Sequence, residues 1–250
     1  MTTFALVHGG QHGGWCWEQV EPLLQAAGHA TVAPDLPFED EGAGSREWAS
    51  VVIDALGSAE AGGDVVLVGH SMGGLALPVV AARRSVRGMV FLGALVPVPG
   101  RPIAEVLAEE APSVVFDASL GDASDSPTGL SWEAARAGFY QDCEEDVARR
   151  AFERLRAMSL VAHTEACPLQ EWPDVPSVTI VMSDDRAVSP DWSRRVAQGR
   201  LGAPVRELPG GHSPFLSRPA ELAELLVTIA SDLPQVGTSD LESTQDGASR

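Results

Sequence analysis

The sequence predicts an α/β fold in which a mostly parallel central sheet carries helices on both faces. Two observations lead to this prediction. Short apolar runs alternate with segments of helical periodicity along most of the chain, which is typical of parallel strands joined by crossover helices. One of these apolar runs also leads through a glycine-flanked serine directly into small residues that can open a helix.

Six strands are expected, and helices fill most of the gaps between them. The expected strands are residues 4–7, 30–34, 65–69, 88–96, 177–182 and 205–208. Residues 45–59 carry apolar side chains at helical spacing. Ser189 can cap a helix that begins at Pro190, and Pro219 suits the first turn of the last helix.

The alternation of strands and helices stops between about Pro97 and Pro168. This stretch holds two helical segments, at 103–111 and 132–158, with an acidic loop of small residues at 117–129. We therefore expect a core of residues 1–97 and 168–234 and a helical cap, or lid, at 98–167. Residues 235–250 are polar and aperiodic, which predicts a disordered tail.

Composition excludes several classes of function. The net charge of −18 disfavours nucleic acid and anionic membranes, because phosphate binding requires clustered cations. All 17 basic residues are arginine, so neither a lysine Schiff base nor a P-loop lysine can form. The longest apolar runs are shorter than 18 residues, so no membrane span is expected.

The cysteines and the amino terminus bear on the compartment. Cys16, Cys143 and Cys167 are odd in number and widely spaced, which predicts buried free thiols rather than disulfides or a zinc knuckle. The first residues look like a buried strand rather than a signal peptide, so we expect a cytoplasmic protein. The absence of lysine and asparagine fits a GC-rich genome.

The glycine-flanked serine is the main candidate for chemistry. Gly69-His70-Ser71-Met72-Gly73 reads G-x-S-x-G and follows an apolar run. This pattern is typical of a sharp strand-to-helix turn that exposes a serine hydroxyl, with glycines where side chains would collide. A dinucleotide site is disfavoured, because its G-x-G-x-x-G pattern requires a glycine where Ser71 stands.

A reactive serine needs a base and a group that orients the base. Among six histidines, His212 is preferred as the base, because it follows the last expected strand. Asp184 and Asp185, at the end of the fifth strand, are candidates for the orienting acid. The other histidines are given structural or pocket-lining roles. We expect His8 and His70 to donate hydrogen bonds within turns, His29 to lie at the start of a strand, and His12 and His163 to line the pocket.

Two backbone amides are expected to stabilise an oxyanion. One is Met72 N–H, directly after the nucleophile at the start of the next helix. The other is Gly10 N–H, in the glycine-rich loop after the first strand. His8 and His12 flank glycines rather than lying on a helix, so no metal site is expected, and no cofactor is needed.

With these parts, the chain resembles the α/β-hydrolase superfamily, and more narrowly the plant methylesterase and hydroxynitrile lyase group with its bacterial relatives, over roughly residues 4–232. The motifs that carry the resemblance are His8-Gly9-Gly10-Gln11-His12-Gly13-Gly14-Trp15-Cys16-Trp17, Ala26-Ala27-Gly28-His29, Gly69-His70-Ser71-Met72-Gly73-Gly74, Phe139-Tyr140-Gln141-Asp142-Cys143 and Gly210-Gly211-His212. The resemblance implies a catalytic triad of Ser71, Asp185 and His212, with the Gly10 and Met72 amides as oxyanion hole. Its D-x-x-V spacing favours Asp185 over Asp184.

Two positions separate the branches of this group. Hydroxynitrile lyases carry a threonine at the position of Gly9 and a lysine at that of Ser213, so the resemblance implies an esterase here. We expect a cofactor-free serine hydrolase that cleaves a small-molecule ester through an acyl-enzyme on Ser71. A lyase or cyclase using His212 as general base, and a non-catalytic ligand receptor, are the alternatives. The sequence leaves the oligomeric state open, with a homodimer as one option.

Overall fold

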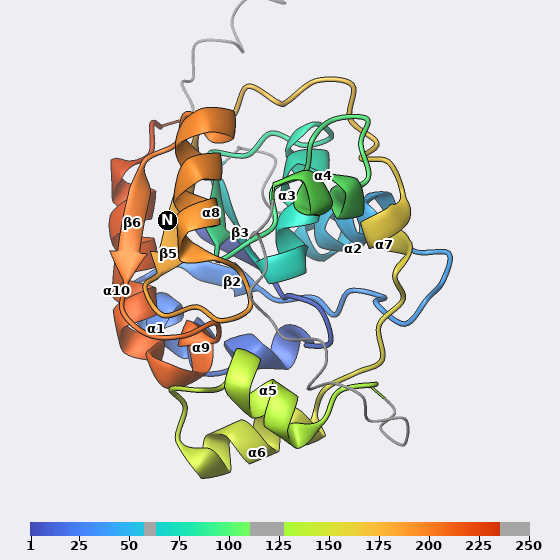
Figure 1. Ribbon diagram of the computed structural model, residues 1–250. Helices are drawn as coiled ribbons and strands as arrows, with labels where there is room; N and C mark the ends of the chain where they lie inside the picture. The colour runs from blue at the N-terminus through green and yellow to red at the C-terminus, as the bar shows by residue number, and fades with distance from the viewer. Residues whose placement is uncertain (58–63, 111–127, 236–250) are drawn as a thin grey trace, which may run out of the picture.

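The computed structural model describes residues 1–57, 64–110 and 128–235, and its centre is a six-stranded parallel sheet (Figure 1). The strands lie in the order β2-β1-β3-β4-β5-β6. They are β1 (Thr3–Val7), β2 (Ala30–Val32), β3 (Val65–His70), β4 (Gly88–Leu92), β5 (Ser177–Met182) and β6 (Val205–Leu208). Every pair is parallel, so all six strands end at the same edge of the sheet.

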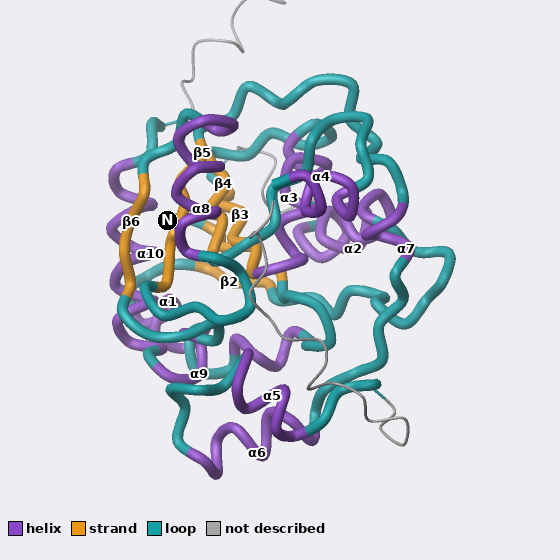
Figure 2. The backbone as a smooth tube through the Cα atoms, viewed as in Figure 1, coloured by secondary structure: helices purple, strands orange, loops and turns teal. Residues whose placement is uncertain are grey.

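Helices cover both faces of this sheet, as expected (Figure 2). The α-helices are α1 (Glu21–Ala26), α2 (Ser45–Leu56), α3 (Leu77–Ala81), α4 (Ile103–Glu109), α5 (Trp132–Gly138), α6 (Glu145–Glu153), α7 (Val161–Thr164), α8 (Pro190–Val196), α9 (Pro214–Ser217) and α10 (Pro219–Asp232). Shorter turns are the 3-10 helices η1 (Gly14–Trp17) and η2 (Ser71–Leu75) and the π-helical η4 (Ala197–Leu201).

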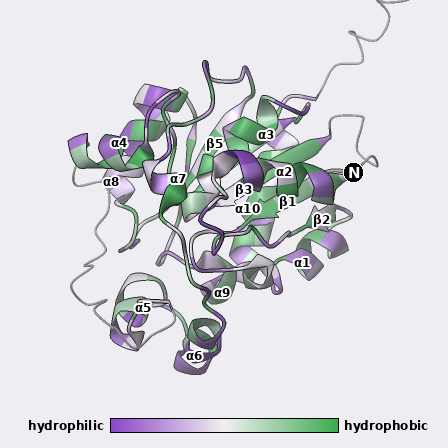
Figure 3. Ribbon diagram, turned by 90° about the vertical axis from the view of Figure 1, so that its right-hand side faces the viewer, coloured by the Kyte–Doolittle hydropathy of each residue, from purple (hydrophilic) through white to green (hydrophobic). Residues whose placement is uncertain are grey.

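Two apolar cores lie on opposite faces of the sheet. In β1, β3, β4 and β5 alternate side chains point to one face or the other, and both sets are buried, whereas the edge strands β2 and β6 are partly exposed. One core packs the sheet against α2, α3 and α8, and the other packs it against α1 and α10. The apolar colouring of Figure 3 is accordingly strongest in the strands. This two-sided burial explains why the strands read as continuous apolar runs.

Two expected strands are shorter than the apolar runs that predicted them. The strand expected at 88–96 ends at Leu92, because Gly93 adopts a φ of +46° and turns the chain. Leu95 N–H then donates to the Ser71 carbonyl at 2.9 Å, so this segment braces the serine turn rather than extending the sheet. The strand expected at 30–34 ends at Val32.

The expected helices are present, with several boundaries shifted. The helix expected at 45–59 ends at Leu56, and the one at 103–111 ends at Glu109. Ser189 caps α8 by accepting a hydrogen bond from Trp192 N–H at 3.3 Å. The residues after Ser71 form the short η2 before α3 begins at Leu77.

The segment expected as a cap divides into two parts. The long helical stretch expected at 132–158 is broken into α5 and α6, which build an apolar cluster of their own around Tyr140 and Cys143. Both ribbon views place these two helices together at one end of the molecule (Figures 1 and 3). In contrast, α4 and α7 contribute Ile103, Val106 and Ala162 to the core that packs the sheet against α2, α3 and α8.

Some expectations fall outside the described residues. These are most of the acidic loop at 117–129 and the tail at 236–250. Within the described parts of the chain, none of the helices combines the length and apolar character needed to cross a bilayer.

Candidate active site

The candidate site lies where the parallel strands end. Ser71 follows β3, Asp185 follows β5 and His212 follows β6. The glycine-rich loop (residues 8–14) follows β1, next to β3 in the sheet. Since the carboxyl ends of parallel strands share one edge, residues distant in the sequence come together there.

Ser71 occupies a strained turn that two glycines make possible. Its φ is +51°, a left-handed conformation that residues other than glycine rarely adopt. A Cβ on Gly73 would lie 2.5 Å from the His8 carbonyl oxygen, and one on Gly69 would lie 2.9 Å from the Leu77 side chain. Side chains at both positions would therefore collide, as the motif predicted.

Asp185 and His212 form a buried pair. His212 Nδ1 lies 2.8 Å from Asp185 Oδ2, and the two residues are 1% and 5% exposed. The other carboxylate oxygen accepts hydrogen bonds from the amides of Ala187 and Val188, at 2.8 and 3.0 Å. Because an ionised carboxylate only accepts, Nδ1 of a neutral His212 carries the proton and Nε2 is left as the basic atom.

Asp184, the other candidate acid, does not bond the histidine ring and instead stabilises the adjacent loops. Its carboxylate accepts hydrogen bonds from the Ser183 hydroxyl at 2.8 Å and from Gly210 N–H at 3.3 Å. Gly93 leaves room for the neighbouring Asp185, since a Cβ there would lie 2.9 Å from Asp185 Oδ2. The structure thus places one carboxylate on the histidine and the other on the loop backbone.

A small cavity of about 80 Å³ brings the remaining candidates together. Its described lining residues are Gly10, Gln11, His12, His70, Ser71, Met72, Phe139, Met158 and His212. Ser71, His212 and the two residues whose amides are the expected donors, Gly10 and Met72, therefore line one cavity. His12 lines it as expected, whereas His163 is not among its described lining residues.

The glycine-rich loop lies directly against the serine turn. A Cβ on Gly9 would lie 2.8 Å from Ser71 Cβ and 2.7 Å from His70 Nδ1. A Cβ on Gly10 would lie 2.7 Å from Met158 Sδ and 2.9 Å from Met72 Sδ. Only a residue without a side chain fits at these positions without displacing its neighbours.

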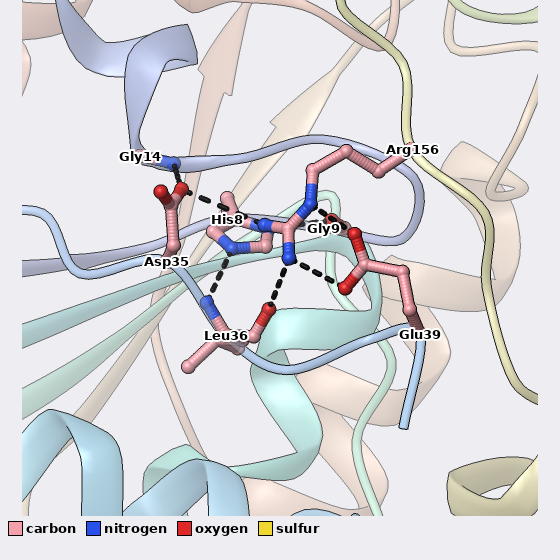
Figure 4. A network of polar contacts seen from close by, with 7 residues as sticks. All are labelled: His8, Gly9, Gly14, Asp35, Leu36, Glu39 and Arg156. Carbon is pink, nitrogen blue, oxygen red and sulfur yellow. Dashed lines mark hydrogen bonds and ion pairs between the residues drawn. The ribbon is translucent and has the colours of Figure 1, made fainter. Parts of the chain in front are cut away.

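His8 holds the start of this loop in place. Leu36 N–H donates to His8 Nε2 at 2.9 Å, and His8 Nδ1–H donates to the Gly9 carbonyl at 2.9 Å. Burial lowers the pKa of His8 to about 4, so the ring is neutral at neutral pH. In Figure 4, Arg156 lies beside this contact and joins Leu36 O to the carboxylates of Asp35 and Glu39.

His12 and His70 are neutral as well. Burial lowers the pKa of His12 to about 3 and that of His70 well below its usual value. His70 Nε2–H donates to the His212 carbonyl at 2.8 Å and so ties the serine turn to the histidine loop. The ring nitrogens of His8 and His12 are each hydrogen-bonded to different partners: those of His8 to the Gly9 carbonyl and Leu36 N–H, and those of His12 to the Gly10 carbonyl and the Tyr140 hydroxyl.

The sequence interpretation gave no role to several residues that meet at this site. Tyr140 donates a hydrogen bond to His12, and Gln141 and Asp142 bond the loops that carry Asp185 and His212. The only signal for them was the string of residues 139–143, which the resemblance singled out without a function. Nothing in the sequence marks Arg156, because its partners Asp35, Leu36 and Glu39 are more than 100 positions away along the chain.

Comparisons with known proteins identify the relatives of this chain. A family model described as "Alpha/beta hydrolase family" matches residues 4–225. A carbendazim hydrolyzing esterase from a Nocardioides strain is 30% identical over 249 residues, which are 92% of this chain and 100% of that protein. Methylesterase 7 from Arabidopsis thaliana is 30% identical over 253 residues, 91% of this chain and 95% of that protein.

The fold itself has close counterparts among solved structures. The crystal structure of polyneuridine aldehyde esterase superposes with a TM-score of 0.77 at 24% identity, and the match covers 92% of this chain and 99% of that one. The kinship to plant and bacterial esterases that the motifs predicted is confirmed.

Proposed function

Because the chain belongs to the alpha/beta hydrolase family, we propose that it hydrolyses a small carboxylic ester through an acyl-enzyme on Ser71, with His212 as base and Asp185 as orienting acid. One observation carries the proposal. Ser71 and His212 line the same cavity, and His212 is oriented by a 2.8 Å hydrogen bond from Nδ1 to Asp185. The esterase relatives support hydrolysis as the reaction.

The geometry supports a two-step acyl transfer. Ser71 Oγ attacks the ester carbonyl while its proton passes to His212 Nε2, and Asp185 stabilises the imidazolium that forms. The tetrahedral oxyanion accepts hydrogen bonds from Gly10 N–H and Met72 N–H. His212 then protonates the departing alkoxide, and a water molecule deprotonated by the same histidine releases the acid and restores Ser71.

The neighbouring histidines assist by remaining neutral. Burial keeps the pKa values of His8, His12 and His70 low, so they add no positive charge beside the nucleophile. The buried imidazolium of the reaction cycle therefore faces one ionic partner, Asp185. This arrangement concentrates the charge on the triad.

Gly9 and Ser213 favour hydrolysis over lyase chemistry. A threonine does not fit at Gly9 without displacing Ser71 or His70. Ser213 is buried and neutral, so it cannot provide the positive charge that a departing cyanide needs. We further propose a bacterial, cytoplasmic setting, which the three free, buried cysteines support.

Replacement of Ser71 tests the proposal. We expect Ser71→Ala to lower turnover of a panel of small esters by about 10⁴-fold to 10⁶-fold, as triad losses do elsewhere. A fluorophosphonate should label the wild-type protein and not the variant. Ser50→Ala, on an exposed face of α2, serves as the matched control and should behave as wild type. Equal turnover in Ser71→Ala and wild type would contradict the proposal.

A further inference from the structure

The turn between α5 and α6, which we call the cap connector (residues 139–142), contacts three loops of the site. Tyr140 O–H lies 3.0 Å from His12 Nε2, in the glycine-rich loop. Gln141 Nε2 donates to the Asp184 carbonyl at 2.8 Å, beside the acid. Asp142 Oδ2 accepts from Gly211 N–H at 2.9 Å, beside the base. Three consecutive residues thus bridge loops that follow β1, β5 and β6.

The connector passes close to the histidine loop. Gly210 has a φ of +99°, and a Cβ on it would overlap the Asp142 carboxylate. A Cβ on Gly211 would overlap the Gln141 amide. The ring of Phe139 lies 5.7 Å from that of His212, centroid to centroid, and Phe139 lines the cavity. The two glycines before His212 therefore make room for the connector.

The Tyr140 contact continues into the oxyanion hole. The Gly10 carbonyl can only accept, so His12 Nδ1, which lies 2.9 Å from it, carries the ring proton. His12 Nε2 is then an acceptor, and the Tyr140 hydroxyl is the donor. Tyr140 and His12 thus form a chain of hydrogen bonds to the carbonyl of Gly10, a residue that lines the cavity.

The next residue of the loop is also held by the cap. Gln11 has a φ of +61°, which is strained for a residue with a side chain. Its carbonyl accepts from Arg156 N–H at 2.7 Å, and its side chain donates to the Thr128 carbonyl at 2.8 Å. Residues on both sides of the connector therefore maintain a backbone conformation that the loop would not favour alone.

The connector is itself anchored. Tyr140 and Cys143 are buried in the cap's own apolar cluster, and Tyr140 N–H bonds the Ala135 carbonyl at 3.1 Å. Its position is consequently set by the packing of α5 on α6. A contact made from such a support fixes its partner, whereas one from a loose loop does not.

We propose that the cap connector is a positioning element of the active site, in which Tyr140, acting through His12, fixes the Gly10 amide for the oxyanion. The inference rests on the proposed function, and it adds that residues outside the sheet and its loops shape the catalytic machinery. Tyr140 touches no reacting atom, so it is a positioning residue. Its removal should affect the transition state more than the bound substrate.

Tyr140→Phe tests this inference, because it removes the hydroxyl and keeps the ring. We expect kcat to fall about 10-fold to 100-fold with KM within about twofold, since the oxyanion forms only during reaction. A trifluoromethyl ketone, which adds to the serine as an oxyanion, should bind more weakly by a similar factor. The backbone amide resonance of Gly10 should also move.

Trp132→Phe is the matched control, since Trp132 packs in the same cap against Phe152 and Arg149. It should leave kcat, inhibitor affinity and the Gly10 resonance close to wild type. Tyr140→Phe behaving like this control would overturn the inference while leaving the hydrolase assignment intact. Failure of the wild-type protein to bind the ketone would instead count against the proposed function, and the Gly10 resonance would still decide the positioning role.

Discussion

The adjacent residues Asp184 and Asp185 have different roles because their side chains have different surroundings. Asp185 is buried and bonds His212, whereas Asp184 accepts from the neighbouring Ser183 hydroxyl and from Gly210 N–H in the loop after β6. The difference arises from the turn after β5, which leaves the Asp184 side chain exposed and buries that of Asp185. The two residues are chemically identical and differ only in burial and hydrogen-bond partners.

A pair of substitutions tests this division. Asp185→Asn should lower kcat by about 10⁴-fold, because an amide cannot hold the Nδ1–H tautomer of His212 or balance its charge. Asp184→Asn, one residue away, should retain activity within a fewfold of wild type. Steady-state kinetics on one ester measure both. Similar losses in the two variants would show that the turn as a whole, rather than the Asp185 carboxylate, is what matters.

Sequence could identify the residues that local motifs mark. Ser71 is marked by its flanking glycines, and His212 by its place after the last strand. Tyr140 could not be assigned a role, because its partner His12 is 128 positions away and only the folded chain brings them together. The choice of Asp185 over Asp184 likewise needed the resemblance, since spacing alone left both open.

At the scale of elements, the sheet was predictable and the cap was not. The central strands are buried and form apolar runs, which are visible in sequence. The edge strands β2 and β6 are less buried, but all six strands were predicted. The predicted end of β4 was wrong, because the apolar run continues past Gly93 although the strand does not. The break between α5 and α6 was missed, because helical periodicity persists on both sides of the connector.

Packing of the serine turn on β1 gives a prediction for Gly73. In Gly73→Ala the new methyl would lie 2.5 Å from the His8 carbonyl oxygen and 2.7 Å from that of Val7. Neither backbone atom can move without disturbing the sheet edge, so we expect a loss of about 1–3 kcal/mol in unfolding free energy. Gly199→Ala, where nothing lies within 4 Å, is the control and should be neutral. Denaturant titration of both variants measures the difference, and equal stability would contradict the packing argument.

At the scale of the whole molecule, the site depends on parts that are distant in sequence. The strands place four loops at one edge, and the cap connector bonds three of them from the other side. Burial keeps His8, His12 and His70 at this edge neutral, which has a consequence for stability. A histidine whose pKa is lowered by folding binds fewer protons in the folded than in the unfolded state.

The protein should therefore lose stability as pH falls below about 6.5, the ordinary histidine pKa. The loss continues toward the folded pKa values of about 4 for His8 and about 3 for His12. Acidic residues with lowered pKa values, such as Glu18 and Glu39, add to it only near and below about 4.5. Unfolding free energies should decrease between pH 7 and pH 5, because unfolding takes up protons on His8, His12 and His70 in a number that grows as the pH falls. His163, whose pKa is also lowered by burial, adds to this uptake. Constant stability across this range would contradict neutral burial of His8, His12 and His70.

The central claim is that Ser71 carries the acyl group during turnover. Peptide mass spectrometry of protein quenched during reaction with a slowly deacylating ester tests it most directly. The account predicts that the wild-type peptide containing Ser71 gains the mass of the acyl group. The corresponding peptide of Ser71→Ala should carry no adduct. Turnover without any such adduct, persisting in Ser71→Ala, would contradict the account.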